Sequence, residues 1–182
     1  MMKQVIKEVL YRIRGEYTTE KLIKMGLKVG KNFKRLHGVI LDPSHCWLIS
    51  IGDNVTIAPR VHILAHDAST FVFLGYVKIG RVDIGNNVFI GAESVVLPNV
   101  KIEDNVIIGA HSTVTKNLKK NSVYAGNPAK YICSIDEYIE KNKGLMKYRP
   151  CYDENWTIRK NITTEMKKQM KEELSKGIGF VE

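Results

Sequence analysis

The sequence of 182 residues has few of the residues that crosslink small secreted domains or hold structural metals. Its three cysteines (Cys46, Cys133 and Cys151) are an odd number, lie far apart and form no C-x-x-C pair. This pattern argues against a disulfide framework and against a zinc site, and it suits a reducing compartment. The sequence also lacks the uninterrupted apolar core of a signal peptide and any segment that could span a bilayer, so we expect a cytoplasmic protein.

The shortage of acidic residues is confined to the N-terminus. Residues 1–36 hold ten Lys and Arg against three Asp and Glu, a net charge of +7, whereas residues 37–132 hold eight against seven. Nucleic-acid-binding surfaces usually combine such charge with aromatic residues or a reading helix, and we expect no nucleic-acid partner here. The charge indicates a solvated helix face, or else attraction to an acidic glycan or a membrane surface.

Two helices are predicted in an N-terminal helical segment over residues 1–36. Aliphatic residues at helical spacing predict the first helix between residues 5 and 13, and Gly15 ends it. The stretch TTEKLIKMG predicts the second, with Thr18 or Thr19 as its N-cap and Gly26 as its end.

Beyond this segment the periodicity changes from helical spacing to a strict period of six. Aliphatic residues recur at positions 84, 90, 96, 102, 108 and 114, and an earlier block keeps the period at positions 51, 57 and 63. Such a period is typical of a parallel β-helix, in which each strand forms one side of a triangular coil and turns its aliphatic residue inward. Glycine and asparagine between the strands would form the corners, where a positive φ is often needed.

The period is lost in a loop over residues 66–78. Ile63 and Ile84 are 21 residues apart, which is not a multiple of six, so the chain must leave the solenoid there and return. His66 and Asp67 stand where this loop begins. Loops that leave a rigid repeat often carry functional residues, and a histidine can act as a general base near neutral pH.

A C-terminal extension over residues 133–182 follows the repeat. The stretch SIDEYIEKNKG predicts a helix with a capping box from Ser134 to Glu137, and TTEMKKQMKEELSKG predicts a final, highly charged helix. The thin apolar stripe of this last helix favours packing on the domain or on a neighbouring subunit over cofactor binding.

The hexapeptide block IGNNVFIGAESVVLPNVKIEDNVIIGAHST and the closing motif AGNPAK at residues 125–130 carry a resemblance to a known family. Over roughly residues 38–132 the sequence resembles the hexapeptide-repeat acyltransferases, most closely the sugar O-acetyltransferases of galactosides, maltose and capsules. The resemblance implies a mostly β fold with a left-handed parallel β-helix over residues 37–132, and a homotrimer. It also implies acetyl-CoA as donor, a hydroxyl of a sugar or glycan as acceptor, and no metal.

In that family the base is a histidine just after the IAP coil, and His66 occupies this position. It would take the acceptor's proton as the hydroxyl attacks the thioester, in a direct transfer without an acyl-enzyme. Asp67 would orient His66 or contact the acceptor, although a bond between adjacent strand residues requires a turn. Asp42, with Ser44 or His45, would line the acceptor pocket, and a hydrogen-bonded corner is the alternative role for these residues.

The resemblance places acetyl-CoA in a groove between two subunits, near the later coils. Small residues would let the pantetheine approach the backbone, and two lysines would meet the phosphates as point charges. The positions implied in CoA binding are Phe89, Gly91, Ala92, Gly109, Ala110, Thr115, Lys116, Asn127, Pro128 and Lys130.

Other functions stay open at this point. The His-Asp pair alone does not exclude a serine, amino-sugar or antibiotic acetyltransferase, although serine acetyltransferases usually carry a longer helical N-terminal domain. A non-catalytic β-helix scaffold would need neither His66 nor the AGNPAK motif. A γ-carbonic anhydrase shares the solenoid but requires three zinc-binding histidines at a spacing that this sequence lacks.

Overall fold

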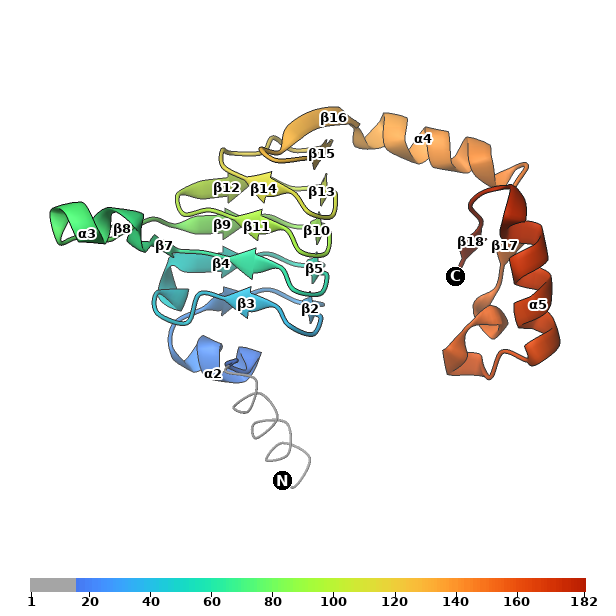
Figure 1. The fold of residues 1–182 in the computed structure, drawn as a ribbon, viewed down its shortest axis with the longest axis horizontal. Helices are drawn as coiled ribbons and strands as arrows, with labels where there is room; N and C mark the ends of the chain where they lie inside the picture. Colours follow the sequence, from blue (N-terminus) through green and yellow to red (C-terminus); the bar gives the residue numbers. More distant parts are fainter. Residues whose placement is uncertain (1–15) are drawn as a thin grey trace, which may run out of the picture. The chain divides into compact units, whose positions relative to one another are not determined.

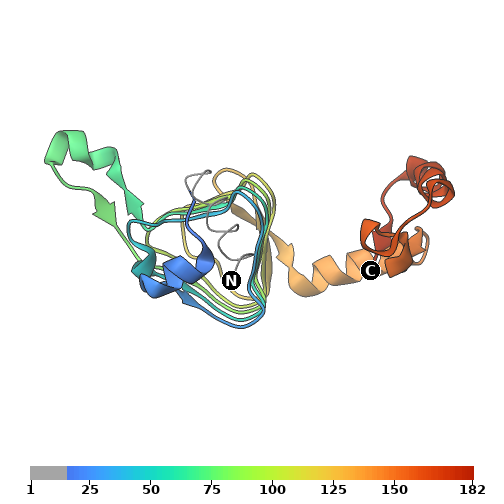
Figure 2. The ribbon, with the colours of Figure 1, turned by 90° about the horizontal axis from the view of Figure 1, so that it is seen from below.

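The computed structural model describes residues 16–182, so the helix predicted between residues 5 and 13 lies outside the described residues. The chain divides into two compact units, one up to Ile135 and the other from Asp136 to Glu182. The first unit is a column of triangular coils, each built from three short strands (Figures 1 and 2).

Three sheets form the sides of the coils, and their strands run parallel apart from the last pair, β15 and β16. Sheet A comprises β1 (Lys28–Val29), β4 (Ile49–Ile51), β9 (Val82–Ile84) and β12 (Val100–Ile102). Sheet B comprises β2 (Lys34–Arg35), β5 (Thr56–Ile57), β10 (Phe89–Ile90), β13 (Val106–Ile108), β15 (Ser122–Ala125) and β16 (Lys130–Ser134). Sheet C comprises β3 (Ile40–Leu41), β6 (His62–Ile63), β11 (Val95–Val96) and β14 (Thr113–Val114).

The packing confirms the predicted period of six. All nine aliphatic residues at the repeat positions are buried in one hydrophobic core. Equivalent residues of successive coils pair in register, as Ile57, Ile90 and Ile108 do in sheet B. Each aliphatic side chain therefore lies on its counterpart in the next coil, and the core is continuous along the column.

The solenoid begins earlier than predicted, at β1, inside the segment predicted to be helical. Among the described residues of that segment, the predicted second helix is confirmed as α2 (Thr19–Lys24), and the Thr18 side chain accepts a hydrogen bond from Lys21 N. Arg35 explains the missed first coil, because it occupies an aliphatic position in register with Ile57. Its guanidinium donates to Tyr17 O over 2.8 Å, so a polar contact replaces core packing there.

A ladder of asparagines forms the corner between sheets A and B. Five of them have φ between 53° and 57°, the left-handed conformation that asparagine tolerates better than most residues. The side-chain amide of each of the first four donates to the amide oxygen of the asparagine in the next coil over 2.8–3.0 Å. The ladder comprises Asn32, Asn54, Asn87, Asn105 and Asn121.

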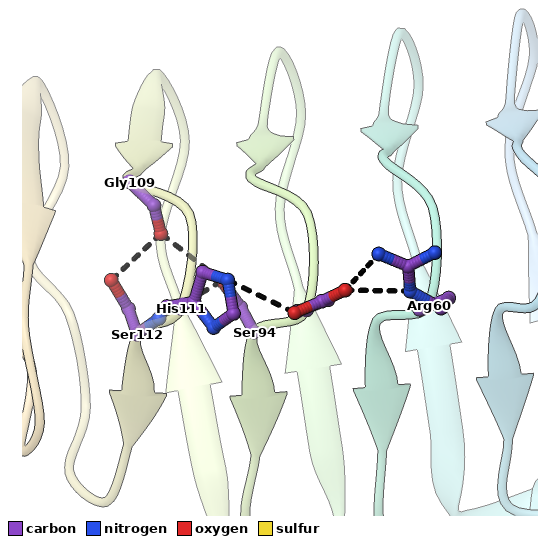
Figure 3. Close-up of polar contacts among 6 residues, drawn as sticks. Arg60, Ser94, Gly109, His111 and Ser112 are labelled. Atoms are coloured by element: carbon purple, nitrogen blue, oxygen red, sulfur yellow. Dashed lines mark hydrogen bonds and ion pairs between the residues drawn. The ribbon is translucent and has the colours of Figure 1, made fainter.

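Ionisable residues occupy the equivalent positions at the corner between sheets B and C (Figure 3). Arg60, Glu93 and His111 all have φ between 56° and 60°. The Glu93 carboxylate pairs with the Arg60 guanidinium of the preceding coil and, over 2.9 Å, with His111 Nε2 of the following one. The adjacent arginine holds the pKa of Glu93 below its ordinary value. Because Arg60 and His111 are exposed, the pairs contribute little to stability.

The break in the period forms an arm, which begins at His66 as the predicted loop does. β7 (His66–Asp67) pairs antiparallel with β8 (Lys78–Ile79), and between them lie a 3-10 turn and the one-turn helix α3 (Phe71–Leu74). The arm projects from the column (Figures 1 and 2). Its tip exposes five large apolar side chains, a concentration typical of an interaction surface. They are Phe71, Val72, Phe73, Leu74 and Tyr76.

The second unit contains both helices predicted for the C-terminal extension. These are α4 (Ile135–Met146) and α5 (Thr164–Glu173), joined by segments that include the parallel pair β17 (Cys151–Tyr152) and β18 (Phe180–Val181). The Tyr152 hydroxyl donates to Glu173 over 2.7 Å, and burial together with this carboxylate raises the pKa of Tyr152 to about 12. Over residues 16–182, no helix combines the length and apolarity needed to cross a membrane.

Close stacking of the coils can be tested at Gly91. An added Cβ there would lie 2.4 Å from Ala110 N, so the two coils would have to separate. We expect Gly91→Ala to lower the free energy of unfolding by about 1–3 kcal/mol, measured as a fall in Tm. Gly144→Ala in α4 is the control, since its Cβ would meet nothing within 4 Å and alanine favours helix. An unchanged Tm for Gly91→Ala would contradict the close contact.

Candidate active site

The predicted base, His66, lies at the corner between sheets C and A, where the chain leaves the second coil and enters the arm. The preceding residue, Ala65, is fully buried and fixes this end of the coil in the core. The side chain of His66 is 34% exposed, so a ligand can reach its ring from solvent.

A carboxylate from the neighbouring coil holds the His66 ring. Asp42 follows β3, which pairs with β6 in register, so the ends of these two strands lie side by side. Asp42 Oδ2 lies 2.5 Å from His66 Nδ1 and also accepts the backbone N–H groups of Ala65 and His66 over 2.9 Å. A proton on Nδ1 directed at this carboxylate leaves the lone pair on Nε2, which is the form of imidazole that can act as a base.

This geometry corrects the role predicted for Asp42. Its side chain is completely buried, and its second oxygen accepts the backbone N–H of Ser44 over 3.1 Å. A carboxylate in this position cannot reach an acceptor in solvent. Asp42 is therefore the residue that orients the His66 ring, a role that was predicted only for Asp67.

Asp67 pairs with residues other than His66, so the first of its two predicted roles, orienting the ring, is wrong, whereas contact with the acceptor stays a prediction. Adjacent strand residues point to opposite faces, and Asp67 pairs with Lys78 Nζ across the base of the arm over 2.5 Å. It also accepts the N–H of Ser69 over 2.8 Å. The lysine lowers the pKa of Asp67 to about 2, so the stabilisation from this pair is present above the ordinary value of 3.8 and is lost only as the pH falls towards 2.

Two further rings continue from His66 along the same corner. The His45 ring centre lies 5.3 Å from that of His66 and 5.3 Å from that of Trp47. Among residues 16–182, His45 Nδ1 is buried without a hydrogen-bond partner. The resemblance implies Ser44 or His45 near the acceptor, but it does not include Trp47. The sequence signal for Trp47 was an aromatic residue two positions after His45 and just before a regular coil begins at Ile49.

Asp42, His45 and His66 also form the one group of three potential metal ligands in the described part of the chain, with one ligand atom each within 4.8 Å of the others. The Asp42 oxygens already accept three backbone N–H groups, and 2.5 Å from Oδ2 to Nδ1 is a hydrogen-bond distance, shorter than the separation of two ligands on one zinc ion. We interpret the cluster as hydrogen-bonded, and the absence of a metal from the function stays a prediction.

The structure divides the predicted CoA residues between two edges of sheet C. The segments Gly91–Ala92 and Gly109–Ala110 precede β11 and β14, whereas Thr115 and Lys116 follow β14. Because the strands are parallel, His66 lies at the edge that carries Thr115 and Lys116, and the glycine segments lie at the opposite edge.

The remaining predicted CoA residues lie on sheet B and at the end of the column. Phe89 points outward from sheet B and is partly exposed. Asn127 and Pro128 lie in the turn between β15 and β16, where Ala129 N donates to Thr113 O, and Lys130 begins β16.

Two of the predicted glycines have a structural reason for being small. A Cβ on Gly91 would collide with the Ala110 backbone, and one on Gly109 would lie 2.9 Å from Ala125 Cβ. The stacking of coils thus accounts for these glycines without a ligand, and their role in CoA binding stays a prediction.

The comparisons with known proteins agree with the fold. A family profile described as bacterial transferase hexapeptide (six repeats) matches residues 81–116. Protein CapG of Staphylococcus aureus is 40% identical over 148 residues, which cover 77% of this chain and 83% of CapG.

Two solved structures are also similar. A maltose O-acetyltransferase from Clostridium difficile 630 is 38% identical with a TM-score of 0.54, over 60% of this chain and 59% of that one. A galactoside acetyltransferase solved with coenzyme A is 32% identical with a TM-score of 0.52, over 63% and 58%. Both similarities thus span less than two thirds of the solved chain.

These similarities confirm the predicted fold class, a left-handed parallel β-helix built from hexapeptide repeats. The similarity to CapG extends over most of both chains, beyond the 36 residues that the profile matches. The chain therefore belongs to the hexapeptide-repeat transferase family and is an acyltransferase, with maltose and galactoside acetyltransferases among its similar members.

Proposed function

We propose that the protein is an acetyl-CoA-dependent O-acetyltransferase that acetylates a hydroxyl of a sugar or glycan, in cytoplasmic polysaccharide biosynthesis. The observation that carries the proposal is the buried Asp42 carboxylate held against Nδ1 of the partly exposed His66. A scaffold without catalysis has no need for such a pair at its surface. The similarity to a maltose O-acetyltransferase and to a galactoside acetyltransferase bound to coenzyme A supports the acceptor class and the donor.

In the proposed reaction, His66 Nε2 accepts the proton of the acceptor hydroxyl while the hydroxyl oxygen attacks the carbonyl carbon of the acetyl thioester. Asp42 stabilises the imidazolium that forms and prevents the ring from turning. Backbone N–H groups stabilise the oxyanion of the tetrahedral intermediate. The C–S bond then breaks, His66 returns the proton to the departing thiolate, and the products are an acetyl ester and CoA with a free thiol.

The division of the site across sheet C supports an assembly of several copies. In one chain, His66 and the segments Gly91–Ala92 and Gly109–Ala110 lie at opposite edges of the sheet, so one copy cannot bring these groups to the same thioester. A neighbouring copy can supply the second edge. We infer a homotrimer, in which each groove is formed by two copies and acetyl-CoA lies between them.

The arm begins at His66, so it is continuous with this proposed interface. Its tip exposes apolar side chains that an isolated chain leaves in water, Phe73 for example at 85% exposure. The base of the arm is fixed by the ion pair of Asp67 and Lys78 and by the pairing of β7 with β8. A fixed apolar tip next to an incomplete site supports contact with the neighbouring copy, where burial of the tip would favour assembly.

The proposed base can be tested by release of free thiol from acetyl-CoA with a panel of sugars and glycan fragments. We expect wild type to acetylate at least one acceptor and His66→Ala to lose about 100-fold or more in kcat, the scale of a general base. Equal thiol release by both proteins would show that His66 is not the base. A wild type that binds neither CoA nor any acceptor would favour the non-catalytic scaffold.

The assignment of the orienting role to Asp42, in place of Asp67, leads to a further prediction. In Asp42→Asn, a neutral amide would replace the carboxylate that stabilises the imidazolium, and its NH2 group would face a backbone N–H that Asp42 now accepts. We expect kcat to fall by about 100-fold or more, and Tm to fall because a buried N–H loses its acceptor. The matched variant Asp67→Asn keeps the oxygen that accepts from Ser69, and we expect kcat within about threefold of wild type. The reverse order of effects would restore the orienting role to Asp67.

The assembly can be tested at the tip of the arm. We expect the double variant Phe71→Ser with Phe73→Ser to dissociate into smaller species and to lose activity, measured by light scattering after size exclusion and by thiol release. Ile158→Ser is the control, because Ile158 is 89% exposed but lies in the other unit. A wild-type monomer with full activity would contradict both the trimer and the shared groove.

A further inference from the structure

Trp47 is an exposed aromatic side chain beside the proposed base. The 3-10 turn Cys46–Leu48 directs Cys46 into the core and Trp47 outward, with 53% of its surface exposed. The turn packs closely against Gly26, because a Cβ at Gly26 would lie 2.8 Å from Trp47 Cβ. Since tryptophan is buried on average, a half-exposed indole on a tightly supported turn suggests contact with a ligand or partner.

The indole is the outer member of the row of three rings. Trp47, His45 and His66 follow one another with 5.3 Å between neighbouring ring centres. The ring of Trp47 is therefore within about 11 Å of that of His66, twice the 5.3 Å separation. His45 lies between them with its buried Nδ1 unpartnered among the described residues, which is typical of a functional site rather than of a packed corner.

The chemistry of this row defines its ligand. The indole offers a flat apolar face, and the partly exposed imidazole of His66 offers a polar edge. A pyranose ring matches both, because its C–H groups form an apolar face and its hydroxyls surround the rim. An acceptor stacked on Trp47 would lie at the same corner as His66, so that a hydroxyl of this acceptor could reach the proposed base.

We propose that Trp47 is the platform on which a pyranose ring of the acceptor stacks, and that it thereby selects cyclic sugars over other alcohols. This inference rests on the proposed function, because it assigns the acceptor class of the same site. An adenine could also stack on an indole, but the thioester end of acetyl-CoA must lie at His66, far from the adenine. A cyclic sugar is thus the occupant that the row favours.

Kinetics with two acceptors of similar composition test the platform. The first acceptor would be methyl β-galactopyranoside, which has a rigid ring face. The second would be galactitol, which is an open chain with similar hydroxyls. For the pyranoside, Trp47→Ala should raise the acceptor KM by about tenfold or more with the KM for acetyl-CoA unchanged, and Trp47→Phe should recover most of the loss. For galactitol, the same variants should resemble wild type. An unchanged KM for the pyranoside, or an equal rise for both acceptors, would overturn the inference.

Fluorescence separates this inference from the proposed function, because it needs no turnover. The chain has two tryptophans, so Trp156→Phe leaves Trp47 as the only indole reporter. We expect a saturable change in emission with the pyranoside, even if no acceptor is acetylated, and none with galactitol. A change with acetyl-CoA alone would assign Trp47 to the donor, and dissociation of Trp47→Ala into smaller species would assign it to a subunit interface. Either result would overturn the platform.

Discussion

The close stacking of one coil on the next is the constraint on which the rest of the structure depends. Parallel strands in exact register bring backbone atoms of successive coils together, so that even one Cβ at Gly91 would collide with Ala110 N at 2.4 Å. The same register stacks the aliphatic residues into one core and aligns the corner asparagines for their ladder of amide hydrogen bonds. The register of the strands, the packing of the core and the hydrogen bonds at the corners therefore depend on one another. A substitution that disturbs one of them disturbs the others.

The candidate site uses this register as its alignment device. Asp42 and His66 are 24 residues apart, yet the pairing of β3 with β6 places them in hydrogen-bond contact without any flexible segment. Because each residue follows a strand that is fixed by its neighbours, the imidazole is held in its orientation before a substrate arrives. Electrostatic preorganisation of this kind requires little rearrangement during reaction. A rigid solenoid thus suits a reaction in which the protein supplies mainly a base and alignment.

Much of this could be predicted from the sequence, and the failures have a common physical origin. The period of six reveals the coils because it follows from covalent geometry repeated along one chain, and the break at His66 reveals the arm. The role of Asp42 is invisible because it depends on register between coils, whereas sequence proximity suggested Asp67, whose side chain points the other way. The first coil was missed for a similar reason, since Arg35 replaces an aliphatic residue and finds its partner, Tyr17 O, far along the chain.

The same constraint indicates where substrate selection can reside. Positions within the coils are occupied by the core, by the corner ladders or by backbone contacts such as that of Gly91, and they have little freedom to adapt to different ligands. The turn that carries His45 and Trp47 and the arm that begins at His66 both lie outside the period of six, at the same corner of the column. Residues there can change without disturbing the stack. A fold that cannot vary its repeat must recognise its acceptor through such interruptions, and these two interruptions flank the proposed base.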